Sequence, residues 1–128
     1  MINPIKKLLV TTLLLLHWWV VSAQNDTIDS LYSIYITQPH DTVIAKIAHE
    51  LSTEYLLINS DSSIYYSQIS LQKHTALGDK LGQADALLNA TRAYIYSGQY
   101  DLGMKSGTKS LNLYRTLGNQ IGTTESLK

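Results

Sequence analysis

Apolar residues recur at steps of three and four along most of the chain after residue 40, which is the pattern of amphipathic helices. The clearest stripe lies within Leu81–Ser97, where a helix is predicted, and a second helix is predicted over Asp101–Leu117. Gly98 follows the first of these segments and suits the left-handed conformation that ends many helices, and Gly118 is expected to end the second. The stripe of the first segment consists of Ala84, Leu87, Leu88, Ala90, Thr91, Tyr94 and Ile95.

Three more helices are predicted upstream, over Thr27–Thr37, Val43–Ile58 and Ser62–Leu77. Asp41 or Thr42 is expected to cap the second of these helices and Asp61 the third, because their side-chain oxygens accept hydrogen bonds from free backbone amides. Pro39 prevents the first helix from continuing. No strand candidate interrupts the helical segments, so the fold is predicted to be all-α.

The chain repeats itself with a period of 40 residues. Leu77-Gly78-Asp79-Lys80-Leu81-Gly82 recurs as Leu117-Gly118-Asn119-Gln120-Ile121-Gly122, and four further identities share this offset. Repeats of this length are typical of stacked helical units. The predicted divisions are a short helix and linker (24–40), two repeats (41–80 and 81–120) and the start of a third repeat (121–128). Because the third repeat is cut short, the chain is expected to be a fragment.

The first 23 residues have the features of a secretory signal peptide. Lys6 and Lys7 precede an apolar run from Leu8 to Val21, and Val21-Ser22-Ala23 supplies the small residues of a cleavage site. An uncleaved membrane anchor is the alternative. However, the apolar run would cover only about 21 Å of a hydrocarbon core that is roughly 30 Å thick. We expect cleavage after Ala23 and export to the periplasm or out of the cell.

Cleavage would also change the composition of the protein. It would remove Trp18 and Trp19 and leave eight Lys and Arg residues against ten Asp and Glu residues. That net negative charge offers no basic surface for nucleic acid or for an anionic membrane. The chain has no cysteine, which excludes disulfides and a lipid attached at the cleavage site.

Aromatic and small residues along the second repeat resemble the pattern of tetratricopeptide repeats (TPRs). The matching positions are Leu87, Thr91, Tyr94, Gly98 and Tyr100, followed by Gly103, Gly107 and Ser110 where the two helices would cross. The first repeat matches less fully, through Ala48, Ser52, Tyr55, Ser63, Ser67 and Ser70. The repeat is longer than the usual length of about 34 residues. It resembles the long-helix variety whose units end in Leu-Gly-Asp.

The resemblance implies a right-handed stack of antiparallel helix pairs, a TPR-like α-solenoid that is incomplete at its carboxyl end. It assigns structural roles to Tyr55, Tyr94, Gly98, Tyr100, Gly103, Gly107 and Ser110. The layout of signal peptide, Asp29-Ser30-Leu31, Pro39-His40-Asp41 and long repeats also resembles a known arrangement. It is that of the exported amino-terminal TPR region of Bacteroidetes-type sensor histidine kinases and regulators.

Partner-binding residues are expected on the first helix of each unit, at positions that face away from the second helix. On the second unit they are Asp85, Leu88, Arg92, Ile95 and Tyr96. On the first unit they are Lys46, His49 and Thr53, with Leu56 and Leu57 beside them. Such a groove suits a protein or peptide segment that carries an acidic group. For each charged residue, a merely solvated surface position is the alternative.

No catalytic, cofactor or metal site is predicted. His49-Glu50 suggests a zinc peptidase, but the second histidine is missing because Thr53 stands four residues after His49. Gly103-Met104-Lys105-Ser106-Gly107 lacks the Gly-Lys-Ser/Thr of a phosphate loop, and helix packing explains its glycines better.

Three functional hypotheses follow. The first is an exported scaffold without catalytic activity that binds a protein or peptide segment. The second is the truncated periplasmic sensing region of a TPR-containing two-component sensor histidine kinase or a similar signalling protein. An enzyme with an unfamiliar site is the least supported. Self-association through the face exposed after Gly118 is also expected, because no further helix would cover that face.

Overall fold

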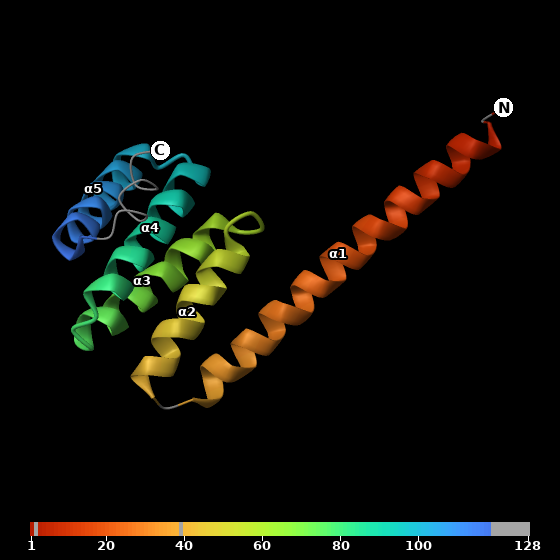
Figure 1. Ribbon diagram of the computed structural model, residues 1–128. Coiled ribbons are helices and arrows are strands. Elements are labelled where there is room, and N and C mark those ends of the chain that lie inside the picture. Colours follow the sequence, from red (N-terminus) through yellow and green to blue (C-terminus); the bar gives the residue numbers. More distant parts are fainter. Residues whose placement is uncertain (2, 39, 119–128) are drawn as a thin grey trace.

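The chain forms five helices and no strand within the residues that the computed structural model describes, which are 1, 3–38 and 40–118. The helices are α1 (Pro4–Thr37), α2 (Asp41–Tyr55), α3 (Ser60–Ala76), α4 (Lys80–Tyr96) and α5 (Tyr100–Leu117). Helices α2 to α5 pack together, each against the next along the chain, and α1 extends away from them as a rod (Figure 1). The prediction of an all-helical fold is confirmed for this part of the chain.

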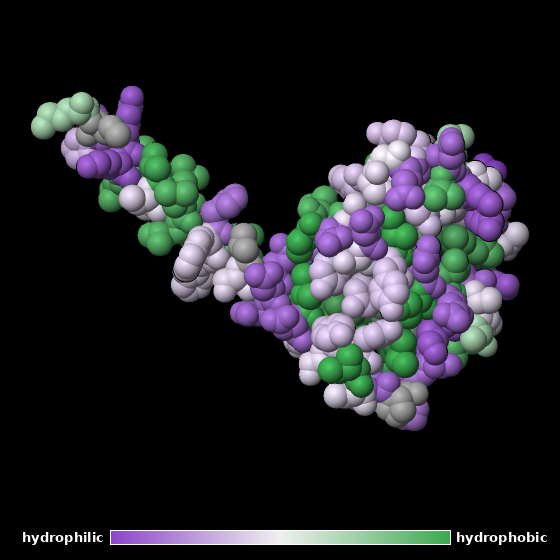
Figure 2. Space-filling view, turned by 180° about the vertical axis from the view of Figure 1, so that it is seen from behind, coloured by the Kyte–Doolittle hydropathy of each residue, from purple (hydrophilic) through white to green (hydrophobic). Residues whose placement is uncertain are grey.

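The first helix is much longer than predicted. The sequence pattern places its start at Thr27, whereas α1 begins at Pro4 and continues through Ala23. Pro4 occupies a first-turn position, where a missing backbone N–H breaks no hydrogen bond. No glycine or further proline interrupts the chain before Gln38. The side chains from position 3 to position 20 are all exposed, and their apolar surface lies along the rod (Figure 2).

The predicted caps of α2 and α3 are wrong. Helix α2 starts at Asp41 itself, and His40 at its N-cap makes no side-chain cap bond. The Asp41 carboxylate instead accepts a hydrogen bond from Lys73 Nζ at 2.7 Å. Helix α3 is capped by Asn59, whose Oδ1 accepts from a first-turn amide at 3.0 Å, and Asp61 lies inside that turn. The cap falls on Asn59 because its backbone is extended there.

Glycines mark the carboxyl ends of α4 and α5. Gly98 has a φ angle of 76°, which confirms the left-handed conformation predicted for it after α4. Gly118, which was predicted to end α5, has a φ angle of 67° and is left-handed as well. The predicted start of a third repeat (121–128) lies outside the described residues. Helix α2 lacks such a glycine and ends at Tyr55, earlier than the predicted Ile58.

One hydrogen bond recurs at matching positions of the two repeats. Ser70 Oγ donates to the Ala45 carbonyl at 3.1 Å, and Ser110 Oγ donates to the Ala84 carbonyl at 2.8 Å. In each case a small residue of the second helix reaches the backbone of the first, which requires the two helices to cross closely. The pair α4 and α5 and the pair α2 and α3 therefore share one packing contact.

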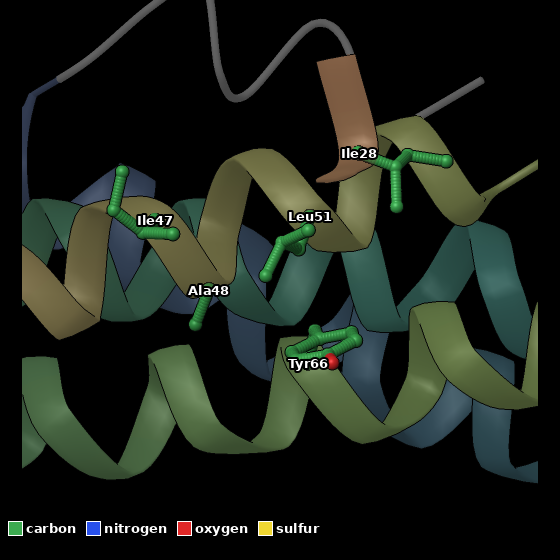
Figure 3. Close-up of a cluster of buried hydrophobic side chains, with 5 residues drawn as sticks. All are labelled: Ile28, Ile47, Ala48, Leu51 and Tyr66. Carbon is green, nitrogen blue, oxygen red and sulfur yellow. The ribbon is translucent and has the colours of Figure 1, made fainter. Parts of the chain in front are cut away.

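The core between α1, α2 and α3 consists of aliphatic side chains and tyrosine. Figure 3 shows Ile28 of α1 above Ile47, Ala48 and Leu51 of α2, with Tyr66 of α3 beneath them. Tyr66 also stacks on Tyr55, with 5.7 Å between ring centroids, and meets Tyr35 edge to face at 5.8 Å. Tyrosine thus fills the volume that phenylalanine occupies in most cores. A second, smaller cluster joins Ala84, Leu88 and Tyr114.

Candidate functional site

The predicted groove residues lie around two separate hollows rather than one continuous groove. The α2–α4 hollow has a volume of about 210 Å³ and the α4–α5 hollow a volume of about 790 Å³. The first is lined by Lys46, His49, Glu50, His74, Asp79, Leu81, Gly82 and Asp85. The second is lined by Leu88, Thr91, Arg92 and Ile95 of α4 and by Tyr100, Gly103, Met104, Gly107, Thr108 and Leu111 of α5.

The eight predicted partner-binding residues divide between these hollows. Lys46, His49 and Asp85 meet at the α2–α4 hollow, whereas Leu88, Arg92 and Ile95 line the α4–α5 hollow. The other two, Thr53 and Tyr96, are exposed residues that border neither hollow. Leu88 is only 7% exposed, because it also packs in the cluster between α4 and α5.

A cap at the start of α4 shapes the α2–α4 hollow. Asp79 Oδ1 accepts from the Gly82 amide at 3.0 Å, and its Oδ2 lies 2.9 Å from His74 Nδ1. The hydrogen bond from Gly82 is the main cause that lowers the pKa of Asp79. Gly82 leaves room for the His74 ring, since a Cβ at this position would overlap the ring. This arrangement was not predicted, although an aspartate three residues before a first-turn amide, as Asp79 is before Gly82, is a recognisable capping pattern.

The charge of the α2–α4 hollow is negative. Its lining carries three carboxylates, those of Glu50, Asp79 and Asp85, and one ammonium group, that of Lys46. Burial lowers the pKa of His49 below its usual value, so that this imidazole is neutral at pH 7. The lining therefore favours a basic ligand group, in contrast to the acidic peptide expected from the sequence.

A buried amide links the two repeats and was not predicted. Asn89 of α4 is 5% exposed, and its Nδ2 donates to Ser52 Oγ and to Thr53 Oγ1 of α2, at 2.9 Å in both cases. Its Oδ1 lies 3.5 Å from Arg92 Nη1. In the sequence, Asn89 interrupts the apolar stripe between Leu88 and Ala90, and this interruption could have indicated a buried hydrogen-bonding residue.

The α4–α5 hollow is largely apolar and has glycines along its floor. A Cβ on Gly103 would lie 3.2 Å from Ile95 Cγ1, and one on Gly107 would lie 3.3 Å from Thr91 Cγ2. These distances agree with the prediction that both glycines allow α4 and α5 to approach closely. Tyr100, which was expected to be structural, is instead 65% exposed at the rim.

The remaining residues with an expected structural role lie at contacts between helices or at a helix end. Tyr55 packs against the core, and Tyr94 accepts a hydrogen bond from Gln68 Nε2 at 3.1 Å. Within the part of the chain that the structure describes, no three His, Cys, Asp or Glu side chains converge as metal ligands would.

Helix α1 is long and apolar enough to cross a membrane, and a signal sequence meets the same criteria. Searches of protein families, curated proteins and solved structures found no match to the chain.

Proposed function

We propose that the chain is an exported TPR-type scaffold without catalytic activity, which binds a protein or peptide segment across α2 and α4. In this proposal α2 with α3 and α4 with α5 are antiparallel pairs of a right-handed stack. The recurring serine-to-carbonyl bond of the two pairs supports that arrangement. The first helices of the two pairs would then form the binding face.

The α2–α4 hollow is the observation that carries the proposal. It brings Lys46 and His49 of one repeat together with Asp85 of the next around one hollow. Side chains from two repeats converge there although they are far apart in sequence. A hollow of this size takes a side chain of a larger ligand rather than a whole peptide.

The charges around this hollow indicate which kind of side chain of the partner segment would bind in it. Glu50 is exposed, and Asp85 is half-buried with its Oδ1 accepting a hydrogen bond from the Tyr114 hydroxyl. The Glu50 carboxylate and the second Asp85 oxygen therefore remain to meet an incoming cation. Arginine would offer five donors to these oxygens and lysine three. The proposed partner segment therefore carries a basic residue that enters the α2–α4 hollow.

A peptide library displayed on phage tests this proposal without a known partner. Peptides selected on the full chain should carry a basic residue at a fixed position. Their affinity should fall by about tenfold or more when Glu50→Gln and Asp85→Asn are combined, because a charge-assisted hydrogen bond contributes roughly 1.5–3 kcal/mol.

Glu54→Gln is the matched control, because Glu54 lies on the same helix outside the hollow. The proposal is wrong if the selected peptides bind the double variant and the parent chain equally well. Peptides that lose binding to Glu54→Gln alone would also contradict it.

Helix α1 favours a second candidate, the sensing region of a membrane-attached signalling protein. Its exposed apolar part and the part that packs against α2 through Ile28 form one continuous helix. If the amino-terminal part stays in a membrane, α1 would hold the repeats directly at the membrane surface. Extraction of membranes with alkaline carbonate distinguishes the two candidates, since a cleaved scaffold is released and an anchored protein is retained.

A further inference from the structure

We propose that acidification releases a basic ligand group from the α2–α4 hollow, because a protonated His49 imidazole then competes with that group for Asp85. His49 and Asp85 both line this hollow. This inference rests on the function proposed above, since it concerns the regulation of the same hollow. The pH around the protein would then determine how tightly the partner segment is held.

His49 lies among charged or titratable groups that three helices bring to the hollow. The groups of the lining besides His49 are Lys46 and Glu50 of α2, His74 of α3, Asp79 at the N-cap of α4 and Asp85 within α4. Arg92 of α4 also acts on His49 electrostatically, although Arg92 lines the α4–α5 hollow. A proton that His49 gains is therefore added within the same hollow as the carboxylates that would bind the ligand.

Hydrogen bonds within the chain already occupy most of the carboxylate oxygens on the α4 side of the hollow. Asp79 Oδ1 caps α4, and Asp79 Oδ2 lies 2.9 Å from His74 Nδ1. Asp85 Oδ1 accepts from the Tyr114 hydroxyl. The second oxygen of Asp85 is then the acceptor that this side of the hollow offers to a cation. A basic ligand group and a protonated His49 would both be attracted to this oxygen.

Burial keeps His49 neutral at pH 7, whereas Asp85 favours its protonated form. Burial lowers the pKa of His49 because an imidazolium loses hydration there, and the nearby His74 and Arg92 act in the same direction. Among the groups that favour the protonated form, Asp85 has the largest effect and Glu50 follows. A ligand cation beside Asp85 would cancel this attraction. A bound cation and a proton on His49 therefore disfavour each other by the same free energy.

The other imidazole of the hollow, that of His74, is less suited to this role. His74 is 9% exposed, and its Nδ1 faces Asp79 Oδ2. The charge of a proton on His74 would therefore be balanced by a carboxylate that belongs to the cap of α4. Asp85 would stay available to the ligand.

The direction of the pH dependence follows from the competition at Asp85. The affinity for a basic group should be constant at neutral and higher pH, where His49 is uncharged. It should fall as the pH drops below the ordinary histidine pKa of 6.5 and approaches the lowered pKa of His49. Repulsion between like unit charges at a solvent-accessible site should weaken binding by roughly three- to tenfold.

The arginine derivative N-acetyl-arginine amide tests the proposal, because it carries a guanidinium group and no other charge. The full chain would be held in lipid nanodiscs, and its dissociation constant for this probe would be measured by NMR. The reporter is the shift of the methyl signals of Leu81, which lines the hollow. We expect the dissociation constant to be about three- to tenfold higher at about pH 5 than at about pH 7.5. Equal dissociation constants at the two pH values would overturn the proposal.

His49→Gln removes the titrating group, so the dissociation constant of this variant should be the same at both pH values. His40→Gln is the matched control and should keep the pH dependence of the parent chain. His40 is an exposed histidine of the same region that lies outside the hollow and makes no side-chain cap bond. If His49→Gln weakens on acidification as much as the parent chain, other groups cause the change and the proposal is wrong. A Leu81 signal that the probe does not shift even at about pH 7.5 would overturn the function proposed for the hollow as well.

Discussion

At the scale of single residues, small side chains make the decisive contacts between helices. Ser63 Oγ donates to the Ser52 carbonyl of the neighbouring helix at 2.6 Å, and its counterpart one repeat later is Gly103. A Cβ on Gly103 would lie 3.5 Å from the Thr91 carbonyl oxygen, which is the equivalent contact. Both repeats thus hold their helices at a distance that larger residues would prevent. The effect of adding an atom at such a position should therefore depend on whether the group that it meets can move aside.

Gly82→Ala should lower the free energy of unfolding by about 1–3 kcal/mol, because the added methyl group would force the nearly buried His74 ring to move. Urea unfolding followed by circular dichroism measures the change. Gly103→Ala is the control and should stay within about 1 kcal/mol of the parent, because its closest contact is the half-exposed Ile95 side chain and alanine favours a helix. Equal losses in both variants would show that the His74 contact is unimportant.

Asn89→Ala should also destabilise the fold by about 1–3 kcal/mol, since it removes both hydrogen bonds to α2 and leaves the buried Ser52 hydroxyl without this donor. Thermal unfolding of the variant and of Asn112→Ala, an exposed position on α5, provides the comparison. The second variant should change stability by no more than about 0.5 kcal/mol. If Asn89→Ala behaves like Asn112→Ala, this buried amide does not stabilise the contact between repeats.

At the scale of elements, α1, α2 and α3 are held together by tyrosines. Tyr66 contacts Tyr35 of α1 and Tyr55 of α2, and Tyr65 packs edge to face against it. Burial raises the pKa of Tyr66 to about 12 and also raises the pKa of Tyr35. The junction of these three helices therefore depends on neutral phenol groups.

Stability should fall as the pH rises from about 10 to about 12. In this window the unfolded chain, with an ordinary tyrosine pKa of 10.0, releases the Tyr66 proton before the folded chain does. Urea unfolding at a series of pH values measures the decline. Tyr66→Phe should make the decline shallower, although Tyr35 would still contribute to it. An unchanged slope in Tyr66→Phe would contradict the assignment.

The sequence pattern predicted the four helices of the repeats from apolar residues at helical spacing and from the turn residues between the helices, and three of the helices are followed by a left-handed glycine. Helix α3 has the weakest apolar pattern, because serines make up most of its buried face. The sequence pattern did not predict the caps of α2 and α3, since several adjacent polar residues can serve as a cap and backbone geometry selects one. The pattern also did not predict that the groove residues would line two separate hollows. Which side of α4 faces α2 and which faces α5 depends on packing, so Asp85 and Arg92, which were expected in one groove, lie at different hollows.

At the scale of the whole molecule, α1 has two parts. One is exposed and apolar, and the other packs against α2 and α3. Ile28 is 7% exposed, and Leu31 and Tyr35 pack against the same core. The predicted cleavage after Ala23 falls before these three residues. Removal of the first 23 residues would therefore leave the contacts of α1 with α2 and α3 intact.

The exported protein should start at Gln24 and contain no tryptophan, because both tryptophans precede the cleavage site. Amino-terminal sequencing and the fluorescence spectrum of material recovered from the periplasm or the medium check this. Tryptophan emission from exported protein would show that the signal segment was retained. A control with Ala23→Pro next to the cleavage site should block processing and keep the emission.

The serines at the helix crossings have a consequence for the response of the fold to temperature. Apart from Leu51, the largest fully buried side chains among the described residues are Ser52, Ser63, Ser67, Ser70 and Ser110. Unfolding would thus expose these hydroxyl groups together with the apolar core, and the two kinds of surface change the heat capacity in opposite directions. The increment measured by calorimetry should therefore be smaller than that of a chain of equal length whose helix crossings are filled by leucine. A smaller increment makes the stability vary less steeply with temperature.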